Sequence, residues 1–374
     1  MADLWFAETN ARRIEAAVIT GYEAAAQLAG IPNYKLYPGD PRRLFLEAIA
    51  LLLAQQNAVI DLTGKSNLLR YAGEATIADL GWLYGPRGDR LQPSHAITTI
   101  EFTLSAARNS VTTVPGGTRL TTGSLVFQTA EPLDIPAGEL TGRVAAICDT
   151  PGPEANGMLP GQIMEIIDRG PFVEKAINVT ESAGGANVED IEAYRERIRN
   201  LPESFSVAGP DGAYWFWAKT ANPGIIDVAV WSPEPGHVNV VPLMEGGELP
   251  TQDILDAVYD IMSDKTKRPL TDFVHVIDPE PIDYDVTITY WIERSNAPMA
   301  VAIQTAVTAA VSDYLRWQSS RLGLDIIPDE LTRRVMEAGA RRVDIASPVF
   351  TLLQQGQVAQ AGTVTVSYGG LEDA

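Results

Sequence analysis

The sequence predicts an α+β multidomain protein with an N-terminal helical segment, a central all-β domain and two small C-terminal α/β modules. At 374 residues the chain is longer than one hydrophobic core usually organises. Helical periodicity gives way near residue 93 to short β-branched runs, which are followed by two alternations of strand and helix patterns. We therefore divide the chain into domains at residues 1–92, 93–181, 182–280 and 281–374.

The N-terminal segment has the period of amphipathic helices. The apolar residues at helical spacing are Ile14, Val18, Tyr22, Ala25 and Ala29 in a first helix, and Phe45, Ile49, Leu52, Leu53, Val59 and Ile60 in a second. Gly30-Ile31-Pro32 ends the first helix, and Pro41 suits the first turn of the second. A third helix is expected over residues 67–82.

Residues 93–181 are predicted to form a compact all-β domain. The segment from Ile97 to Leu104 is rich in β-branched and aromatic residues, as strands are. Further strand-like runs are residues 125–127, 144–147 and 163–167, and turn signals occur at Pro115-Gly116-Gly117, Gly123, Pro136-Ala137-Gly138 and Pro151-Gly152-Pro153.

Two strand-helix-strand patterns follow the break at Gly184-Gly185. The first has helices at residues 188–200, 210–220 and from 250 onward, with strands at 225–231, 237–243 and 273–277. The second has helices at 298–317 and 331–337, with strands at 284–291, 343–345 and 363–366. The similarity between the two patterns is too weak to indicate a duplication.

Composition excludes several classes of partner. The net charge of -20 repels phosphate backbones, so we expect no nucleic-acid partner. The most apolar run, Leu44 to Ile60, is interrupted by Glu47 and by Gln55-Gln56-Asn57, which argues against membrane insertion. A single cysteine, Cys148, allows no intrachain disulfide, and the N-terminus lacks a signal-peptide pattern, so we expect synthesis in the cytoplasm.

Signals for chemistry are sparse, and we predict no enzyme. The three histidines, His95, His237 and His275, lie in different segments without metal-ligand spacing. Cys148 follows an apolar run, which indicates a buried thiol rather than a nucleophile. No phosphate-binding loop, dinucleotide fingerprint or nucleophile elbow occurs. We therefore predict no catalytic residues, cofactor or metal.

Two alternatives stay open at this point. The run Tyr214-Trp215-Phe216-Trp217, with the scattered carboxylates, could serve a cell-wall hydrolase or carbohydrate-binding protein, although Tyr214 and Trp217 share a helical face that suits packing. The tripeptide Arg87-Gly88-Asp89 is the single feature that favours an adhesin.

The N-terminal helices offer more apolar surface than three helices can hide among themselves. Helices of this kind commonly complete a bundle with partner chains. The residue pattern alone therefore indicates a protein that assembles with others.

A series of short motifs, in order along nearly the whole chain, resembles the Baseplate J-like family. The motifs are Tyr71-Ala72-Gly73, Val114 to Thr118, Phe127-Gln128-Thr129, Asn156-Gly157, Gly161-Gln162-Ile163, Gly184-Gly185 with Glu189, Tyr194-Arg195 with Arg197, Ala208-Gly209-Pro210, Ala213-Tyr214 with Trp217, Pro223-Gly224-Ile225 with Asp227, Gly236-His237-Val238 and Arg268 to Asp272.

The resemblance implies a structural wedge subunit of a contractile-tail baseplate, in a phage or a tail-like injection particle. It implies a ring around a central hub and spike that transmits the contraction trigger to the sheath. The implied partners are a companion baseplate wedge protein, a second copy of the chain itself, a lysozyme-like wedge protein and the hub or spike. The implied location is the host bacterial cytoplasm during assembly and then the tail baseplate.

We predict protein-interface roles for ten residues: Ile14, Val18, Tyr22, Phe45, Ile49, Leu53, Tyr194, Arg195, Arg197 and Trp217. For Tyr194, Arg195 and Arg197 the alternative is a joint between domains of one chain, where arginines would pair with carboxylates. The glycines at 184, 185, 209 and 224 are expected to allow close turns that a Cβ would hinder.

Overall fold

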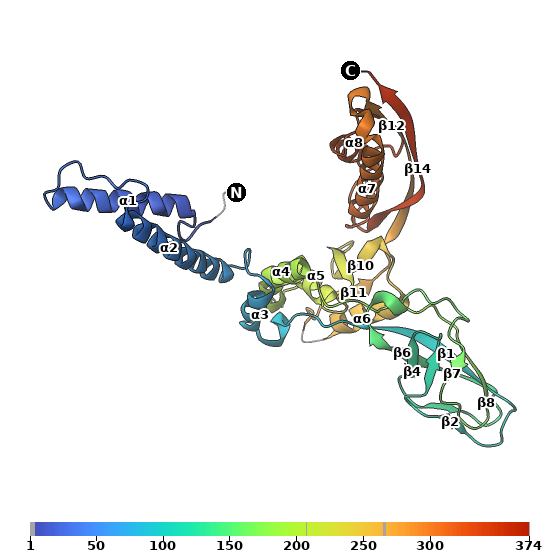
Figure 1. Cartoon of the computed structure of the whole chain (residues 1–374). Coiled ribbons are helices and arrows are strands. Elements are labelled where there is room, and N and C mark those ends of the chain that lie inside the picture. Colours follow the sequence, from blue (N-terminus) through green and yellow to red (C-terminus); the bar gives the residue numbers. More distant parts are fainter. Residues whose placement is uncertain (1–3, 207, 265–266, 374) are drawn as a thin grey trace. The chain divides into compact units, whose positions relative to one another are not determined.

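The computed structural model describes residues 4–206, 208–264 and 267–373. It divides into two compact units, Met1–Asp89 and Arg90–Ala374. The predicted fold class is confirmed, because a helical N-terminal segment precedes a nearly closed β-sheet and two small mixed-sheet modules (Figure 1).

The first unit is helical. Its elements are α1 (Ala11–Leu28), α2 (Pro41–Ser66), α3 (Glu74–Trp82) and the short 3-10 helix η1 (Gly85–Gly88). The Asn10 side chain caps α1, and Asp40 caps α2 with Pro41 in the first turn, as predicted. The third helix begins at Glu74 rather than at residue 67, because hydrogen-bonded turns occupy the segment between Leu68 and Ala72.

The first domain of the second unit is a six-stranded sheet in the order β7-β3-β4-β6-β1-β8. Its strands are β1 (His95–Leu104), β3 (Arg119–Thr121), β4 (Val126–Thr129), β6 (Thr141–Pro151), β7 (Glu165–Ile166) and β8 (Val173–Asn178), and a separate pair is formed by β2 (Thr112–Val114) and β5 (Leu133–Ile135). The end strands β7 and β8 contact each other, which nearly closes the sheet into a barrel.

Alternation along the strands fills the barrel. In β1 every second side chain is buried, and Ile100 and Phe102 are completely so. Phe127 from β4 and Leu120 from β3 join them in one apolar core, which also contains the Cys148 side chain. After β6, the 3-10 helix η2 (Pro153–Ala155) begins the segment that leads to β7.

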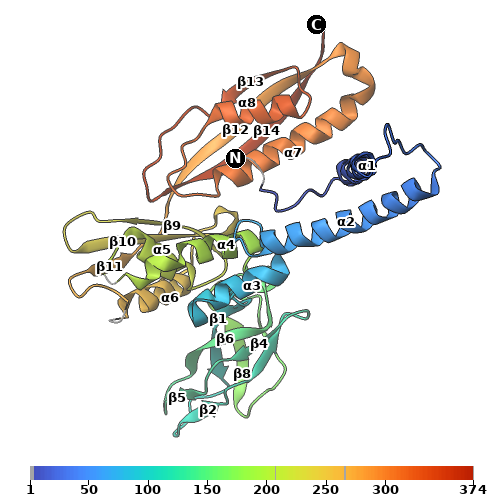
Figure 2. The ribbon, with the colours of Figure 1, turned by 90° about the vertical axis from the view of Figure 1, so that its left-hand side faces the viewer.

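The first α/β module is a three-stranded sheet in the order β11-β10-β9. Its elements are α4 (Ile191–Asn200), η3 (Leu201–Phe205), α5 (Asp211–Lys219), β9 (Ile225–Trp231), β10 (His237–Met244), η4 (Glu245–Gly247), α6 (Gln252–Ser263) and β11 (Phe273–Val276). β10 is antiparallel to β9 and parallel to β11. The helices α5 and α6 lie on one face of this sheet (Figure 2), and their apolar side chains join its core.

The second α/β module has the strand order β13-β12-β14. Its elements are β12 (Glu280–Glu293), η5 (Arg294–Met299), α7 (Ala300–Gln318), α8 (Pro328–Glu337), β13 (Arg342–Ser347) and β14 (Gln357–Glu372). β12 again has one antiparallel and one parallel neighbour, but here the central strand comes first in the chain. The two modules therefore share a sheet type and differ in strand order.

Candidate protein-interaction surfaces and domain joints

The contact between α1 and α2 is narrow. Ile14 packs against Ala50 and Ala54, with Val18 at the edge of this small cluster. Asp61 is buried on the same side of α2, where it accepts a hydrogen bond from the Phe6 backbone N–H at 2.9 Å and pairs with Lys65. Small alanines let the two helices approach closely but bury little apolar area.

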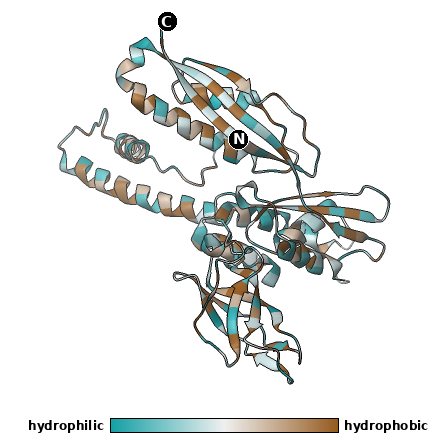
Figure 3. Cartoon of the chain, turned by 90° about the vertical axis from the view of Figure 1, so that its right-hand side faces the viewer, coloured by the Kyte–Doolittle hydropathy of each residue, from teal (hydrophilic) through white to brown (hydrophobic). Residues whose placement is uncertain are grey.

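The opposite side of α2 is apolar and exposed. Eight large apolar side chains of this helix are exposed: Leu44, Phe45, Leu51, Leu52, Leu53, Val59, Ile60 and Leu62. At about 100° per residue they cover roughly half of the helix circumference, centred opposite Ala50 and Ala54. Hydrophobic residues follow α2 along its length (Figure 3). We call these eight residues the α2 stripe.

The six predicted interface residues of this unit do not all lie on one exposed surface. Ile14 and Val18 belong to the α1–α2 contact, so they are not on the exposed surface. Phe45 is 65% exposed and Leu53 is 43% exposed, both in the α2 stripe, with the partly buried Ile49 between them. Tyr22 is exposed beside the Tyr34 ring at a centroid distance of 6.1 Å.

By length and composition alone, α2 is the one helix among the described residues that could also cross a membrane. An apolar surface helix that binds other helices passes the same test, so this is weak evidence. Gln55, Gln56 and Asn57 lie near the middle of α2, and Asn57 donates a hydrogen bond to the Glu8 carbonyl at 2.8 Å. Our prediction of no membrane insertion rests on these polar residues.

Tyr194 and Arg197 are buried rather than displayed. Each is 1% exposed. The Arg197 guanidinium donates two hydrogen bonds to the Glu189 carboxylate, both at 2.7 Å, and the Leu91 backbone N–H donates a third at 3.0 Å. Of the two predicted alternatives, this geometry favours a joint inside the chain, with a bidentate ion pair at its centre.

Arg195 is less buried than Arg197. Its side chain is 18% exposed and pairs with Glu192, whose side chain is 71% exposed, at 3.1 Å. A pair one helical turn apart with one exposed partner contributes little to stability, typically about 0–1 kcal/mol. Arg195 therefore fits a surface contact better than Arg197 does.

The aromatic run on α5 is occupied by packing. The Tyr214 hydroxyl donates to the Asp272 carboxylate at 2.7 Å, and burial, followed by this bond, raises the pKa of Tyr214. Trp217 meets the Phe216 ring edge to face at 5.2 Å, and the Lys267 ammonium lies 4.6 Å from its centroid. Tyr214 and Phe216 are buried, and Trp217, which is partly buried, has a lysine ammonium near its ring, so this run is used mainly for packing.

Three side chains of the second unit that could take part in chemistry, those of Cys148, His95 and Lys219, are each buried or held by a specific contact. Burial raises the pKa of the Cys148 thiol, which suits an unreactive core residue. His95 contacts the Cys148 carbonyl through Nδ1 at 2.7 Å. Burial also lowers the pKa of Lys219, whose ammonium lies 4.8 Å from the Trp215 ring centroid. Within the described ranges no group of three or more His, Cys, Asp or Glu side chains is arranged to hold a metal ion.

One pairing was missed by the sequence analysis. His237 Nδ1 and His275 Nε2 lie 2.9 Å apart, although 38 positions separate them. The parallel register of β10 and β11 brings the two histidines together. In this register His237 lies opposite Phe273, and Asn239 lies opposite His275. Local spacing could not reveal this arrangement.

The adhesin tripeptide does not form an open loop. Arg87 and Gly88 lie at the end of η1, and Gly88 is buried. A Cβ on Gly88 would lie 1.9 Å from the Gly81 carbonyl oxygen, so the two backbones are in close contact. Arg87 and Asp89 are exposed on either side of Gly88, but the short turn that carries them packs against the Gly81 backbone and is not an extended loop.

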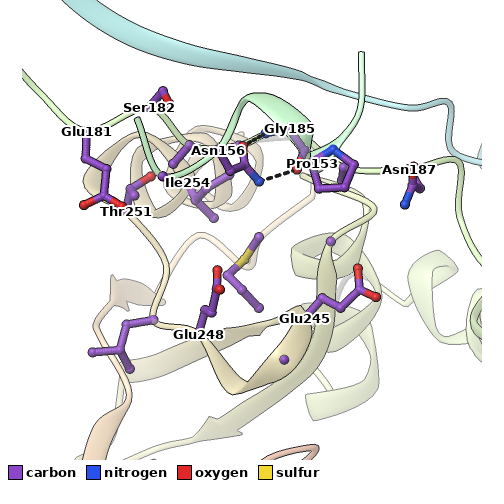
Figure 4. A pocket seen from close by; sticks show the side chains of 18 residues that line it. Pro153, Asn156, Glu181, Ser182, Gly185, Asn187, Glu245, Glu248, Thr251 and Ile254 are labelled. Carbon is purple, nitrogen blue, oxygen red and sulfur yellow. Dashed lines mark hydrogen bonds between the residues drawn. The ribbon is translucent and has the colours of Figure 1, made fainter. Parts of the chain in front are cut away.

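The joint between the barrel and the first α/β module is closed by side chains that bind backbone. Asn156 donates to the Gly185 carbonyl at 2.8 Å and accepts from its N–H at 2.9 Å (Figure 4). Asn222 donates to the Gly184 carbonyl at 2.9 Å, and the Ser94 hydroxyl donates to the same oxygen at 2.6 Å. Beside this network lies an open pocket of about 680 Å³, flanked by Glu181, Glu245 and Glu248.

The two α/β modules are joined in a similar way. Asp227 of β9 accepts a hydrogen bond from the Leu322 backbone N–H at 2.9 Å. Gln360 of β14 donates to the Gly247 carbonyl at 3.3 Å, and the Trp231 ring packs against Gly356. Both joints of the second unit therefore contain buried or partly buried polar contacts rather than bare linkers.

Three domains of the chain match models of known protein families. Three family models match in order: the Baseplate J-like protein barrel domain over residues 99–185, the Baseplate J-like central domain over 206–278 and the Baseplate J-like protein C-terminal domain over 284–367. Baseplate protein J of Escherichia phage P2 is 28% identical over 190 residues, which cover 50% of this chain and 62% of that protein. A solved structure, the cryo-EM structure of the anti-feeding prophage baseplate, 6-fold symmetrised, aligns over 94% of this chain and 96% of its own, at 15% identity and a TM-score of 0.40.

Proposed function

The chain belongs to the Baseplate J-like family and is a structural protein of a phage or phage-related baseplate, and from this premise we propose that it is a wedge subunit. In this role it forms part of a ring around the hub and spike and passes the contraction trigger to the sheath. We propose the domain limits 1–92, 93–181, 182–280 and 281–374 as its working parts.

The α2 stripe is the observation that supports this proposal most strongly. Eight large apolar side chains on one side of one helix form a surface that water solvates poorly. A helix of a partner chain would cover such a stripe, as in a helix bundle. We propose that the companion wedge protein supplies this helix, together with the same helices of a second copy of the chain.

The assembly proposal predicts the behaviour of a double variant. Phe45→Glu with Leu52→Glu should weaken binding to the companion wedge protein by about 100-fold or more, because each apolar side chain contributes about 1.5–3 kcal/mol when buried. Size-exclusion chromatography of the chain co-expressed with the candidate wedge proteins of its particle measures this. Wild-type protein should co-elute with its partner, and the double variant should elute alone.

Leu28→Glu provides the matched control. Leu28 is 91% exposed at the end of α1, outside the α2 stripe, so the same change there should leave co-elution intact. Equal binding by the double variant would count against the stripe as the interface. A wild-type chain indifferent to every candidate would count against the wedge assignment itself.

We propose that the C-terminal module makes the contact between neighbouring copies of the chain in the ring. β14 is an edge strand of 16 residues, and from Gln357 to Leu371 it contains no charged residue in a chain of net charge -20. Edge strands of monomers usually carry charges or prolines that prevent pairing. An uncharged edge is where two acidic copies can approach each other with the least repulsion.

The trigger proposal requires parts that move as rigid bodies. The hydrogen-bonded joints of the second unit support this, because a joint that yields would absorb the motion instead of passing it on. Cryo-EM of the particle before and after contraction should show β14 at a contact between copies and a changed angle between the helical unit and its neighbours. Unchanged angles throughout would refute the trigger role.

We further propose assembly in the host cytoplasm, followed by residence in the tail baseplate beside a lysozyme-like wedge protein and the hub. The alternative, a tail-associated hydrolase or carbohydrate-binding protein, is tested by the turbidity of a peptidoglycan suspension. The structural proposal expects no clearing by purified protein. The packed state of Tyr214 and Trp217 favours the structural proposal.

A further inference from the structure

The outer face of the β10–β11 pair carries the His237–His275 contact. The planes of the two rings are within 3° of parallel and their centroids are 5.2 Å apart, while Nδ1 of His237 and Nε2 of His275 are 2.9 Å apart. With the nitrogens closer than the centroids, the rings meet edge to edge. His275 is exposed and His237 partly so.

This contact places two metal-binding atoms next to each other. One nitrogen must carry a proton and the other a lone pair for the hydrogen bond to form. The ring that donates this hydrogen bond can change tautomer. Its contact nitrogen then gives up its proton to water, and its other ring nitrogen takes one up. Both contact nitrogens then offer lone pairs.

We propose that His237 and His275 form a binding site for a late divalent transition metal such as Zn²⁺, Ni²⁺ or Cu²⁺. Imidazole nitrogens bind these ions at about 2.0–2.1 Å, so two neighbouring ligands of one ion are roughly 3 Å apart. The observed separation of 2.9 Å already matches that spacing. The rings need to tilt toward solvent so that their lone pairs converge, a rotation about χ2 that is soft for histidine.

The neighbouring residues define the site further. Phe273, the register partner of His237, stacks on one face of its ring at a centroid distance of 5.4 Å. Two protein ligands leave the other coordination positions to water, as in an open site. The negative net charge raises the local concentration of cations.

Few other side chains of this protein compete for such an ion. The sequence contains three histidines and one cysteine. Cys148 is buried in the barrel core, and His95 is engaged with the Cys148 carbonyl. Carboxylates are numerous, but they favour hard cations such as Mg²⁺ and Ca²⁺. Excess Mg²⁺ should therefore occupy the carboxylates, so that the remaining binding of the transition metal reports on the histidines.

Calorimetric titration of the full chain, without a histidine tag, with Ni²⁺ or Zn²⁺ in excess Mg²⁺ tests the proposal. Wild-type protein should bind about one equivalent. His275→Gln keeps a side-chain nitrogen close to the position of Nε2 and can still bond to His237, but amides are poor ligands for these metals, so binding should be lost. His237→Asn does the same for Nδ1. Circular dichroism in metal-free buffer verifies that both variants fold.

His95→Asn is the matched control, because it preserves a donor toward the Cys148 carbonyl and should retain wild-type binding. NMR of the imidazole nitrogens gives an independent readout, since two of the three histidines should shift with metal and His95 should not. No saturable binding by wild-type protein, binding abolished by Mg²⁺, or binding retained in both His275→Gln and His237→Asn would overturn the proposal.

Discussion

Glu189→Ala is expected to lower the free energy of unfolding by about 3–5 kcal/mol, the usual cost of removing one partner of a buried ion pair. The Arg197 side chain is 1% exposed and that of Glu189 is 4% exposed. Alanine would remove the acceptor of both 2.7 Å bonds from the guanidinium and of the bond from the Leu91 N–H. The charge of Arg197 would then lie in a low-dielectric interior without its carboxylate.

Urea unfolding followed by tryptophan fluorescence measures this effect, because Trp215, Trp217 and Trp231 lie in the same module. A parallel thermal melt should show a midpoint lower by roughly 10 °C. Arg199→Ala is the control, since Arg199 is 68% exposed and its pair with Glu196 is 3.4 Å long, so its loss should cost less than about 1 kcal/mol. Equal effects of the two variants would show that the buried pair is not a stabilising centre.

A double replacement separates charge from packing. Glu189→Leu with Arg197→Met removes both charges and keeps apolar volume at both positions. Such replacements of buried pairs are often close to neutral. The double variant should therefore recover most of the stability lost in Glu189→Ala, and its failure to do so would point to the lost bond from the Leu91 N–H to the Glu189 carboxylate instead.

The sequence predicted elements well where local patterns decide them. The spacing of apolar residues and the capping residues predict α1, α2, the alternating strand β1 and the amphipathic helix α6. β14 is longer than predicted, because its Gln- and Gly-rich ends have little strand propensity and only pairing with β12 orders them. The domain limits remain a prediction.

The candidate sites were harder to predict, because they depend on long-range register. Nothing local to His237 or His275 indicates that β10 and β11 bring them within 2.9 Å. The sequence predicts that the arginines on α4 pair with carboxylates. It does not single out Glu189 among the 48 acidic residues. Exposure of the α2 stripe likewise becomes visible only once α1 is seen to cover the alanine side alone.

The expected role of the joint glycines divides into two physical causes. Gly184 has φ of 88° and Gly209 has φ of 76°, values that side chains with a Cβ rarely adopt. Gly185 has no positive φ, and its constraint is purely one of space. Substitution by alanine is therefore expected to strain the backbone at Gly184 and to cause a steric clash at Gly185.

Gly185→Ala is expected to cost about 3 kcal/mol or more, because overpacking against backbone is hard to relieve. A Cβ at this position would lie 2.2 Å from the Gly152 carbonyl oxygen and 2.9 Å from Asn156 Oδ1. The barrel would have to separate from the first α/β module to make room, which would break both bonds between Asn156 and Gly185.

Gly184 supplies the contrast at the next position. A Cβ there meets nothing closer than 3.6 Å, so Gly184→Ala should cost only the strain of its backbone, about 1–2 kcal/mol, and Gly184→Asn less. Limited proteolysis and thermal unfolding of the three variants should rank them Gly185→Ala, Gly184→Ala, Gly184→Asn from least to most stable. If Gly185→Ala instead unfolds like wild type, the joint is loose, and a loose joint cannot transmit a contraction trigger as a rigid part.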